Sequence, residues 1–138
     1  MKNFDLDKIK VGNEIKIEKT FYDKDIKIFS ELSGDTNPIH LDENYAKNSR
    51  YKKKLTHGFL ASSLFSGIFG TKTPGPGCVY KSQYLKFIRP IFIGDKIEAK
   101  VKVTEFDKEK KIVKFETTCT TNNKVSISGN AEIFLPNF

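Results

Sequence analysis

The sequence predicts one α+β domain in which an antiparallel sheet wraps around a single long helix. Two observations support this prediction: residues 58–71 contain no charged side chain, and residues 97–104, 112–120 and 125–135 alternate apolar with polar side chains. Alternation with a period of two is typical of half-buried strands. A helix without charge on any side should be buried on most sides, so we expect the sheet to enclose it.

Local patterns place the other elements. Residues 14–19 alternate as a short strand, residues 22–32 carry an apolar helical face, and residues 42–48 resemble a short helix that Asp42 could cap. The sequence 74–77, Pro-Gly-Pro-Gly, ends the long helix, and the aromatic run 79–88 follows as a strand. Breaks at Pro90 and Gly94-Asp95 and polar turns at 107–110 and 121–124 separate the last strands.

Length and composition fit one domain over residues 1–138. Cys78 and Cys119 show no metal-ligand spacing, and we interpret them as small buried residues of a protein in a reducing compartment. The uncharged helix has 14 residues, fewer than the roughly 20 apolar residues that span a bilayer. No signal peptide is evident. We therefore expect a cytoplasmic protein without a membrane segment.

The formal net charge of +7 leaves three interpretations. It could indicate nucleic-acid binding, but the lysines are scattered, the run 52–54 is short, and no nucleic-acid-binding motif is present. A lysine-rich solvated surface is the simpler interpretation, and we expect no nucleic-acid partner. Basic residues near a site could also hold a polyphosphate ligand.

The most informative segment is Gly34-Asp35-Thr36-Asn37-Pro38-Ile39-His40. Pro38 fixes its own backbone and moves Asn37 out of helical geometry, which favours a rigid loop at the end of a helix. Asp35 and His40 could then converge on one small molecule, and such a pair suffices for acid–base chemistry on water. Alternatively, Asp35 is only a turn former and His40 a surface residue beside it.

The second histidine, His57, directly precedes Gly58 and the uncharged helix. The first amides of a helix have no partner inside the helix and carry partial positive charge, so they can receive a developing oxyanion. Gly58 has no side chain to block the approach of a ligand. The plainer interpretations are that Gly58 is a packing glycine and that the Ser66 hydroxyl bonds back to its own helix.

Residues 29–46 and Thr56–Ser66, followed by Gln83–Phe87, Pro90 and Gly94-Asp95, together resemble the MaoC-like dehydratases, in particular the (R)-specific enoyl-CoA hydratases. The resemblance extends from about Val11 to Leu135. It implies a hotdog fold and reversible syn addition of water to a trans-2-enoyl-CoA, which gives an (R)-3-hydroxyacyl-CoA. It also implies a homodimer with each site near the subunit boundary.

By the same resemblance Asp35 and His40 match the catalytic pair, and Gly58 matches the residue whose amide binds the thioester oxygen. Ser66 matches a serine that supports the substrate site, and Asn37 shapes the turn and orients the pair. His57 is then a residue of the helix start and not the catalyst. No metal or redox cofactor is implied, because CoA is part of the substrate. Lysines or Arg89 could contact its phosphates.

Other functions remain open at this point. A 3-hydroxyacyl-[acyl-carrier-protein] dehydratase would use the same residues, and the basic surface suits an acidic carrier protein. A non-catalytic acyl-CoA-binding protein is less favoured because both Asp35 and His40 are present, and a hotdog thioesterase usually lacks this Asp-to-His turn. Acyl chain length and pathway cannot be read from these residues.

Overall fold

The computed structural model describes residues 4–137, and residues 1–3 and 138 of the predicted domain lie outside them. Five strands form one antiparallel sheet in the order β1-β3-β4-β5-β2, as the α+β prediction requires. The elements are η1 (Leu6–Lys8), β1 (Glu14–Thr20), α1 (Asp23–Ser33), α2 (Pro38–Leu41), α3 (Glu43–Asn48), α4 (Gly58–Thr71), β2 (Val79–Phe87), β3 (Lys96–Asp107), β4 (Ile112–Thr121) and β5 (Lys124–Phe134).

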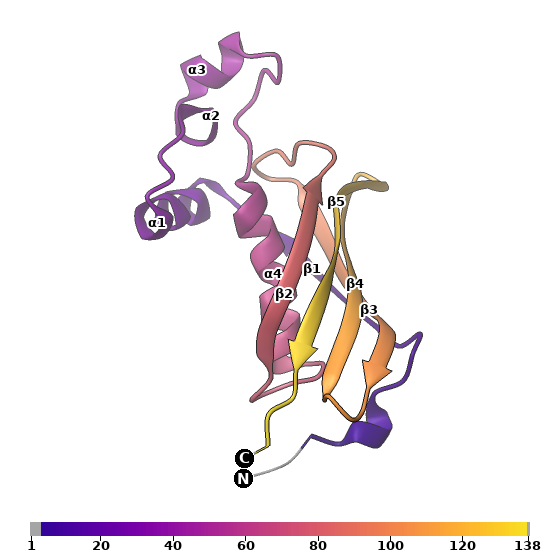
Figure 1. Ribbon diagram of the computed structural model, residues 1–138. Coiled ribbons are helices and arrows are strands. Elements are labelled where there is room, and N and C mark those ends of the chain that lie inside the picture. The colour runs from indigo at the N-terminus through magenta and orange to yellow at the C-terminus, as the bar shows by residue number, and fades with distance from the viewer. Residues whose placement is uncertain (1–3, 138) are drawn as a thin grey trace.

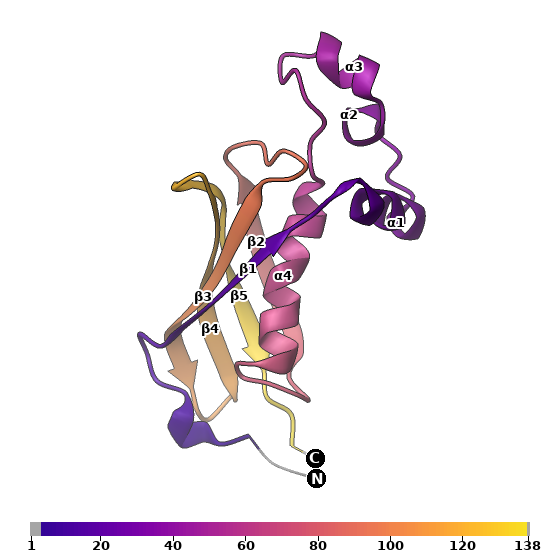
Figure 2. The same ribbon diagram turned by 180° about the vertical axis from the view of Figure 1, so that it is seen from behind.

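The long uncharged helix α4 lies along one face of the sheet, as predicted (Figures 1 and 2). Its buried residues enter the core, where the Phe69 ring packs on Phe115 of β4 with centroids 4.7 Å apart. The sheet curves around one side of the helix only. Phe59 is 67% exposed and Ser66 is exposed, so the expected burial on most sides is wrong for the single chain.

A two-residue turn and one close backbone contact determine how the last strands of the sheet pair. Asn122 and Asn123 both have positive φ, 50° and 62°, and form the two-residue turn between β4 and β5 within the predicted turn 121–124. Gly129 of β5 pairs with Leu85 of β2, and a Cβ atom at Gly129 would lie 1.8 Å from the Tyr84 carbonyl oxygen. Only glycine therefore allows β2 to lie this close to β5.

Helices α1, α2 and α3 stand together beyond one end of the sheet (Figures 1 and 2). Gly34, with φ of 77°, ends α1 in the left-handed conformation. Where the sequence predicted a loop, Pro38 starts the single helical turn α2, because proline suits a first helical position and the Asn37 side chain caps that turn. Asp42 caps α3 as predicted, since it accepts a hydrogen bond from the Tyr45 amide at 3.0 Å.

Among the described residues, no helix has the length and apolar character needed to span a membrane. Cys119 is buried, Cys78 is half-buried, and both thiols are free, in broad agreement with their predicted packing role.

Candidate active site

The turn between α1 and α2 is built by its own side chains. Asp35 Oδ1 accepts a hydrogen bond from the Asn37 amide at 3.2 Å, and Asn37 Oδ1 accepts one from the Ile39 amide at 3.3 Å. Asp35 is therefore a turn former, as the plainer interpretation held, and Asn37 shapes the turn as predicted. Because one carboxylate oxygen suffices for this bond, the other oxygen of Asp35 remains available for chemistry.

His40 lies in α2 and is oriented by the loop before α4. Its Nδ1 lies 2.7 Å from the Leu55 carbonyl oxygen. A carbonyl oxygen only accepts hydrogen bonds, so Nδ1 carries the hydrogen and Nε2 of the neutral ring keeps its lone pair. This arrangement presents a proton acceptor on the side of the ring away from Leu55.

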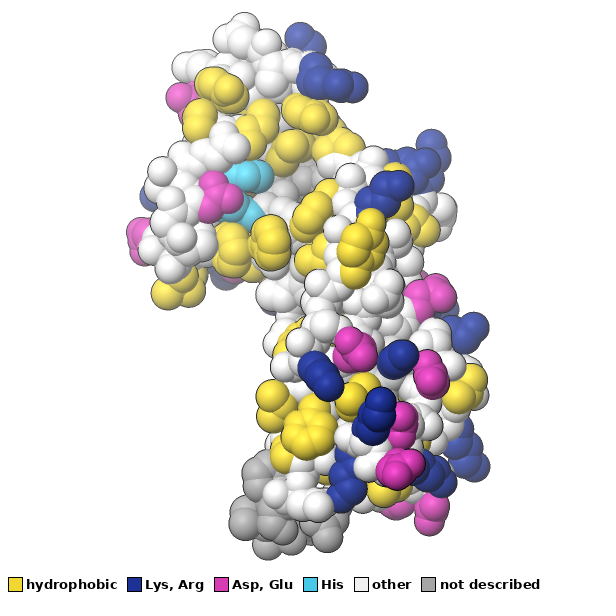
Figure 3. All heavy atoms as spheres, viewed as in Figure 1, with side chains coloured by type: hydrophobic (Ala, Val, Ile, Leu, Met, Phe, Trp, Pro, Cys, Tyr) yellow, Lys and Arg dark blue, Asp and Glu magenta, His cyan; other side chains and the backbone are white. Residues whose placement is uncertain are grey.

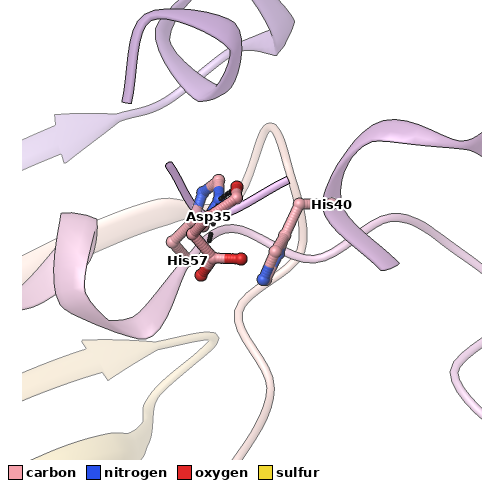
Figure 4. Close-up of side chains that lie close together, drawn as sticks. All are labelled: Asp35, His40 and His57. Atoms are coloured by element: carbon pink, nitrogen blue, oxygen red, sulfur yellow. Dashed lines mark hydrogen bonds and ion pairs between the residues drawn. The ribbon is translucent and has the colours of Figure 1, made fainter. Parts of the chain in front are cut away.

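His57 brings the turn and α2 together at the start of α4. Its ring stacks on the His40 ring with centroids 3.8 Å apart, and its Nε2 lies 3.2 Å from the main-chain carbonyl oxygen of Asp35. The same Nε2 is 3.9 Å from Asp35 Oδ2. Figure 4 shows the three side chains converging, and one possible ligand atom from each lies within 4.8 Å of the others. The predicted meeting of Asp35 and His40 is thus present.

Burial of the His57 ring, which is 2% exposed, lowers its pKa from the ordinary value. The bond to the Asp35 carbonyl opposes this change, the nearby His40 adds to it, and the Asp35 carboxylate opposes it. Burial dominates, so His57 is a neutral imidazole at neutral pH.

Beside His40 a cavity of about 340 Å³ opens at the start of α4. Gly58, Phe59 and Phe87 contribute to its wall, and a Cβ atom at Gly58 would lie 2.5 Å from the Phe87 ring. Gly58 is the first residue of α4, so its amide has no partner within the helix. The geometry therefore places a free helix-start amide and the His40 imidazole around one cavity. Figure 3 shows imidazole atoms beside a carboxylate, between hydrophobic side chains.

Two other residues, Ser66 and Arg89, were expected to contact the substrate, and they lie at different places. Ser66 is exposed and lines a separate cavity of about 390 Å³ between α4 and β2, two helical turns from Gly58. In the single chain it therefore does not join Asp35 and His40. Arg89 does line the cavity that contains His40, and its Nη1 donates to the Val125 carbonyl oxygen at 2.7 Å.

The carboxylate and two imidazoles are donor types that transition metals accept. The hydrogen that His57 Nε2 shares with the Asp35 carbonyl oxygen keeps this nitrogen from acting as a ligand, whereas the His40 Nδ1–H bond to Leu55 leaves His40 Nε2 free. In the neutral tautomer, His40 Nε2 offers a lone pair beside the Asp35 carboxyl group, and these two groups can exchange protons. The arrangement suits general acid–base chemistry.

Sequence reasoning placed His57 correctly at the helix start, where it is the N-terminal cap of α4. It missed the contact of His57 with both members of the pair. It also missed Ser30 of α1, whose Oγ lies 3.3 Å from His57 Nε2. A buried serine inside a helix carries no pattern that would have singled it out.

Comparisons with known proteins show the family and the fold of this chain. Residues 7–126 match the family described as MaoC like domain, and the chain belongs to this family. An (R)-specific enoyl-CoA hydratase of Rhodospirillum rubrum is 44% identical over 93% of this chain and 89% of that protein. A mitochondrial 3-hydroxyacyl-[acyl-carrier-protein] dehydratase of Arabidopsis thaliana is 40% identical over 94% of this chain and 79% of that protein.

Among solved structures, the (R)-hydratase of Aeromonas caviae superposes with a TM-score of 0.91 at 35% identity. The match covers 94% of this chain and 98% of that one. The fold is therefore the hotdog fold predicted from the resemblance.

Proposed function

We propose that this protein is an (R)-specific enoyl-CoA hydratase. It would add water reversibly and with syn geometry to trans-2-enoyl-CoA, giving (R)-3-hydroxyacyl-CoA. The observation that carries the proposal is the convergence of Asp35 and His40, of which His40 lines a cavity that Gly58, the first residue of α4, also lines. The similarity to an (R)-specific enoyl-CoA hydratase at 44% identity supports it.

The proposed chemistry uses a water held between Asp35 and His40. One member of the pair removes a proton while the oxygen attacks the β-carbon, and a proton returns to the α-carbon on the same face. Negative charge grows on the thioester oxygen during attack, and the Gly58 amide is suited to stabilise it. Acid–base catalysis of this kind contributes about 10²–10⁴-fold. The steps need no metal or redox cofactor, so we propose that the enzyme uses none.

The test is incubation with crotonyl-CoA while the loss of enoyl absorbance is followed, with chiral analysis of the product. We expect turnover to the (R)-alcohol, and a loss of about 10²-fold or more in Asp35→Asn and in His40→Ala. Asp7→Asn is a matched control, since that exposed carboxylate lies in η1 at the far end of the molecule. Absence of turnover on every enoyl thioester, or full activity of Asp35→Asn, would reject the proposal.

A carrier-protein thioester is the second candidate substrate. It is favoured by the 40% identity to the Arabidopsis thaliana dehydratase and by the net charge of +7, which suits an acidic carrier protein. Rates measured with one acyl chain on CoA and on acyl carrier protein decide between the two. A higher kcat/KM on CoA supports the hydratase, and the reverse supports the dehydratase.

We further propose a homodimer joined through β2. Strands β1 and β2 are the sheet edges, and β1 carries alternating charges that discourage pairing. β2 instead exposes Val79, Tyr84 and Phe87 at 51%, 59% and 49%. We expect a dimer in analytical ultracentrifugation that Tyr84→Lys weakens and Glu18→Lys, on β1, does not. A wild-type monomer would contradict the proposal.

A further inference from the structure

His57 is buried at the junction of three segments that carry the site. It is the N-cap residue of α4, its ring contacts Phe29 of α1 with centroids 4.8 Å apart, and it stacks on the ring of His40 of α2. Its Nε2 reaches the main-chain carbonyl of Asp35 at 3.2 Å. One side chain therefore touches both members of the acid–base pair without lining the cavity beside His40.

The hydrogen on His57 is placed by its partners. The two groups within hydrogen-bond distance of Nε2 are the Asp35 carbonyl oxygen and Ser30 Oγ at 3.3 Å, and both can accept, while a carbonyl oxygen cannot donate. Nε2 must then carry the hydrogen and share it between the two oxygens. Nδ1 of the neutral ring is unprotonated, and it is buried with no hydrogen-bond partner among residues 4–137.

The charge state follows from the same surroundings. A proton on Nδ1 would be a buried charge with no acceptor in the described part of the chain, which is strongly unfavourable. The ionisable groups that face the ring are Asp35 and His40. A positive charge on His40, if it is the member of the pair that takes the proton, further disfavours a charge on the stacked ring. His57 therefore stays neutral through the cycle.

We propose that neutral His57 is a positioning residue: its Nε2–H holds the Asp35 turn by the main-chain carbonyl while its ring face supports His40. The carbonyl bond fixes the backbone from which the carboxylate extends, and the stacking fixes the tilt of the imidazole. His57 thus fixes the distance between the Asp35 carboxylate and the His40 imidazole without touching the substrate. This inference rests on the proposed hydratase function for its kinetic part only.

Two variants separate the hydrogen bond from simple packing. His57→Gln keeps an N–H near the place of Nε2, whereas His57→Phe keeps an aromatic ring of similar size but has no donor. Because a misplacement of about 1 Å can lower a rate about 10²-fold, we expect kcat of His57→Phe to fall by about that factor. KM should change much less, and thermal stability should be retained. His57→Gln should recover at least about a tenth of the wild-type kcat.

Equal losses in both variants, or wild-type kcat in His57→Phe, would overturn the proposal. Ser30→Ala is a graded comparison, because it removes the second acceptor and leaves the carbonyl bond; it should lower kcat much less than His57→Phe does.

A measurement without turnover keeps the inference testable if a variant fails to fold or the protein lacks hydratase activity. The chain contains only two histidines, so nitrogen NMR of the imidazoles in untagged wild-type protein gives two sets of signals. We expect His57 to show hydrogen on Nε2 and no titration over roughly pH 6–8, where an ordinary imidazole changes charge. His57 with hydrogen on Nδ1, or titrating in that range, would overturn the proposal whatever the activity assay shows.

Discussion

Gly58→Ala is expected to lower activity strongly while leaving the fold intact. The added Cβ atom would lie 2.5 Å from Cε1 and 2.7 Å from Cδ1 of the Phe87 ring. Carbon atoms in contact normally lie about 3.5–4.0 Å apart, so the ring has to move by about 1 Å. That ring forms part of the wall of the cavity that holds His40. Alanine at the first helical position therefore changes the shape of the site without removing its amide.

The effect on stability should be small. Overpacking typically costs about 1–3 kcal/mol, and in the single chain the 49% exposure of Phe87 favours the lower end because the ring has room to move. Replacement of glycine by alanine in a helix offsets roughly 0.5–1 kcal/mol of this. For activity, a shift of about 1 Å in the wall and the bound thioester predicts a loss of about 10²-fold in kcat/KM.

The assay is crotonyl-CoA hydration together with denaturant unfolding. Gly67→Ala is the control in the same helix, since a Cβ atom there meets nothing within 4 Å; it should keep full activity. The double variant Gly58→Ala/Phe87→Leu should regain activity, with an interaction free energy of about 1–3 kcal/mol in the double-mutant cycle. Wild-type kcat/KM in Gly58→Ala, or no interaction in the cycle, would refute the reasoning.

Two further predictions concern stability. Gly129→Ala should destabilise the protein by about 3 kcal/mol or prevent folding, since its Cβ atom would lie 1.8 Å from the Tyr84 carbonyl oxygen in the backbone of β2. Urea unfolding measures this change, and an unchanged unfolding midpoint would contradict the prediction. Burial lowers the pKa of His57 in the folded state, so the unfolded state binds more protons below the ordinary value of about 6.5. The contribution of His57 to the free energy of unfolding should therefore be greatest above a pH of about 6.5. It should decrease as the pH drops from there toward the lowered pKa. His57→Gln should flatten this slope, and an equal slope in both proteins would count against it.

The sequence predicted the strands and α4 well because strong periodic patterns specify them. The helix predicted at 58–71 begins and ends at the observed residues, and the predicted strand 112–120 differs from β4 by one residue. The helical turn that starts at Pro38 was harder to predict, because proline can end a preceding helix and can also begin a new one. The structure shows a helical turn, in which Asn37 Oδ1 accepts from the Ile39 amide and the Asp42 amide donates to the Pro38 carbonyl oxygen.

The site shows the same division. A spacing of five residues across a turn predicted that Asp35 and His40 could converge, and the structure brings them together. The contacts of His57 with that pair depend on how α1, α2 and the start of α4 pack, and no local pattern encodes such packing. Ser66 has the right spacing along its helix, but in the single chain that face of α4 points toward β2 and a different cavity.

The placement of the two described chain ends has a practical consequence. Phe4 and Asn137 border the same small hollow, and Figure 1 shows this region at the opposite extremity of the molecule from α2. Purification tags, fluorophores or fused domains attached near Phe4 or Asn137 would lie far from the cavity beside His40. The protein could thus be immobilised through either of these two regions while the cavity beside His40 stays open to solution.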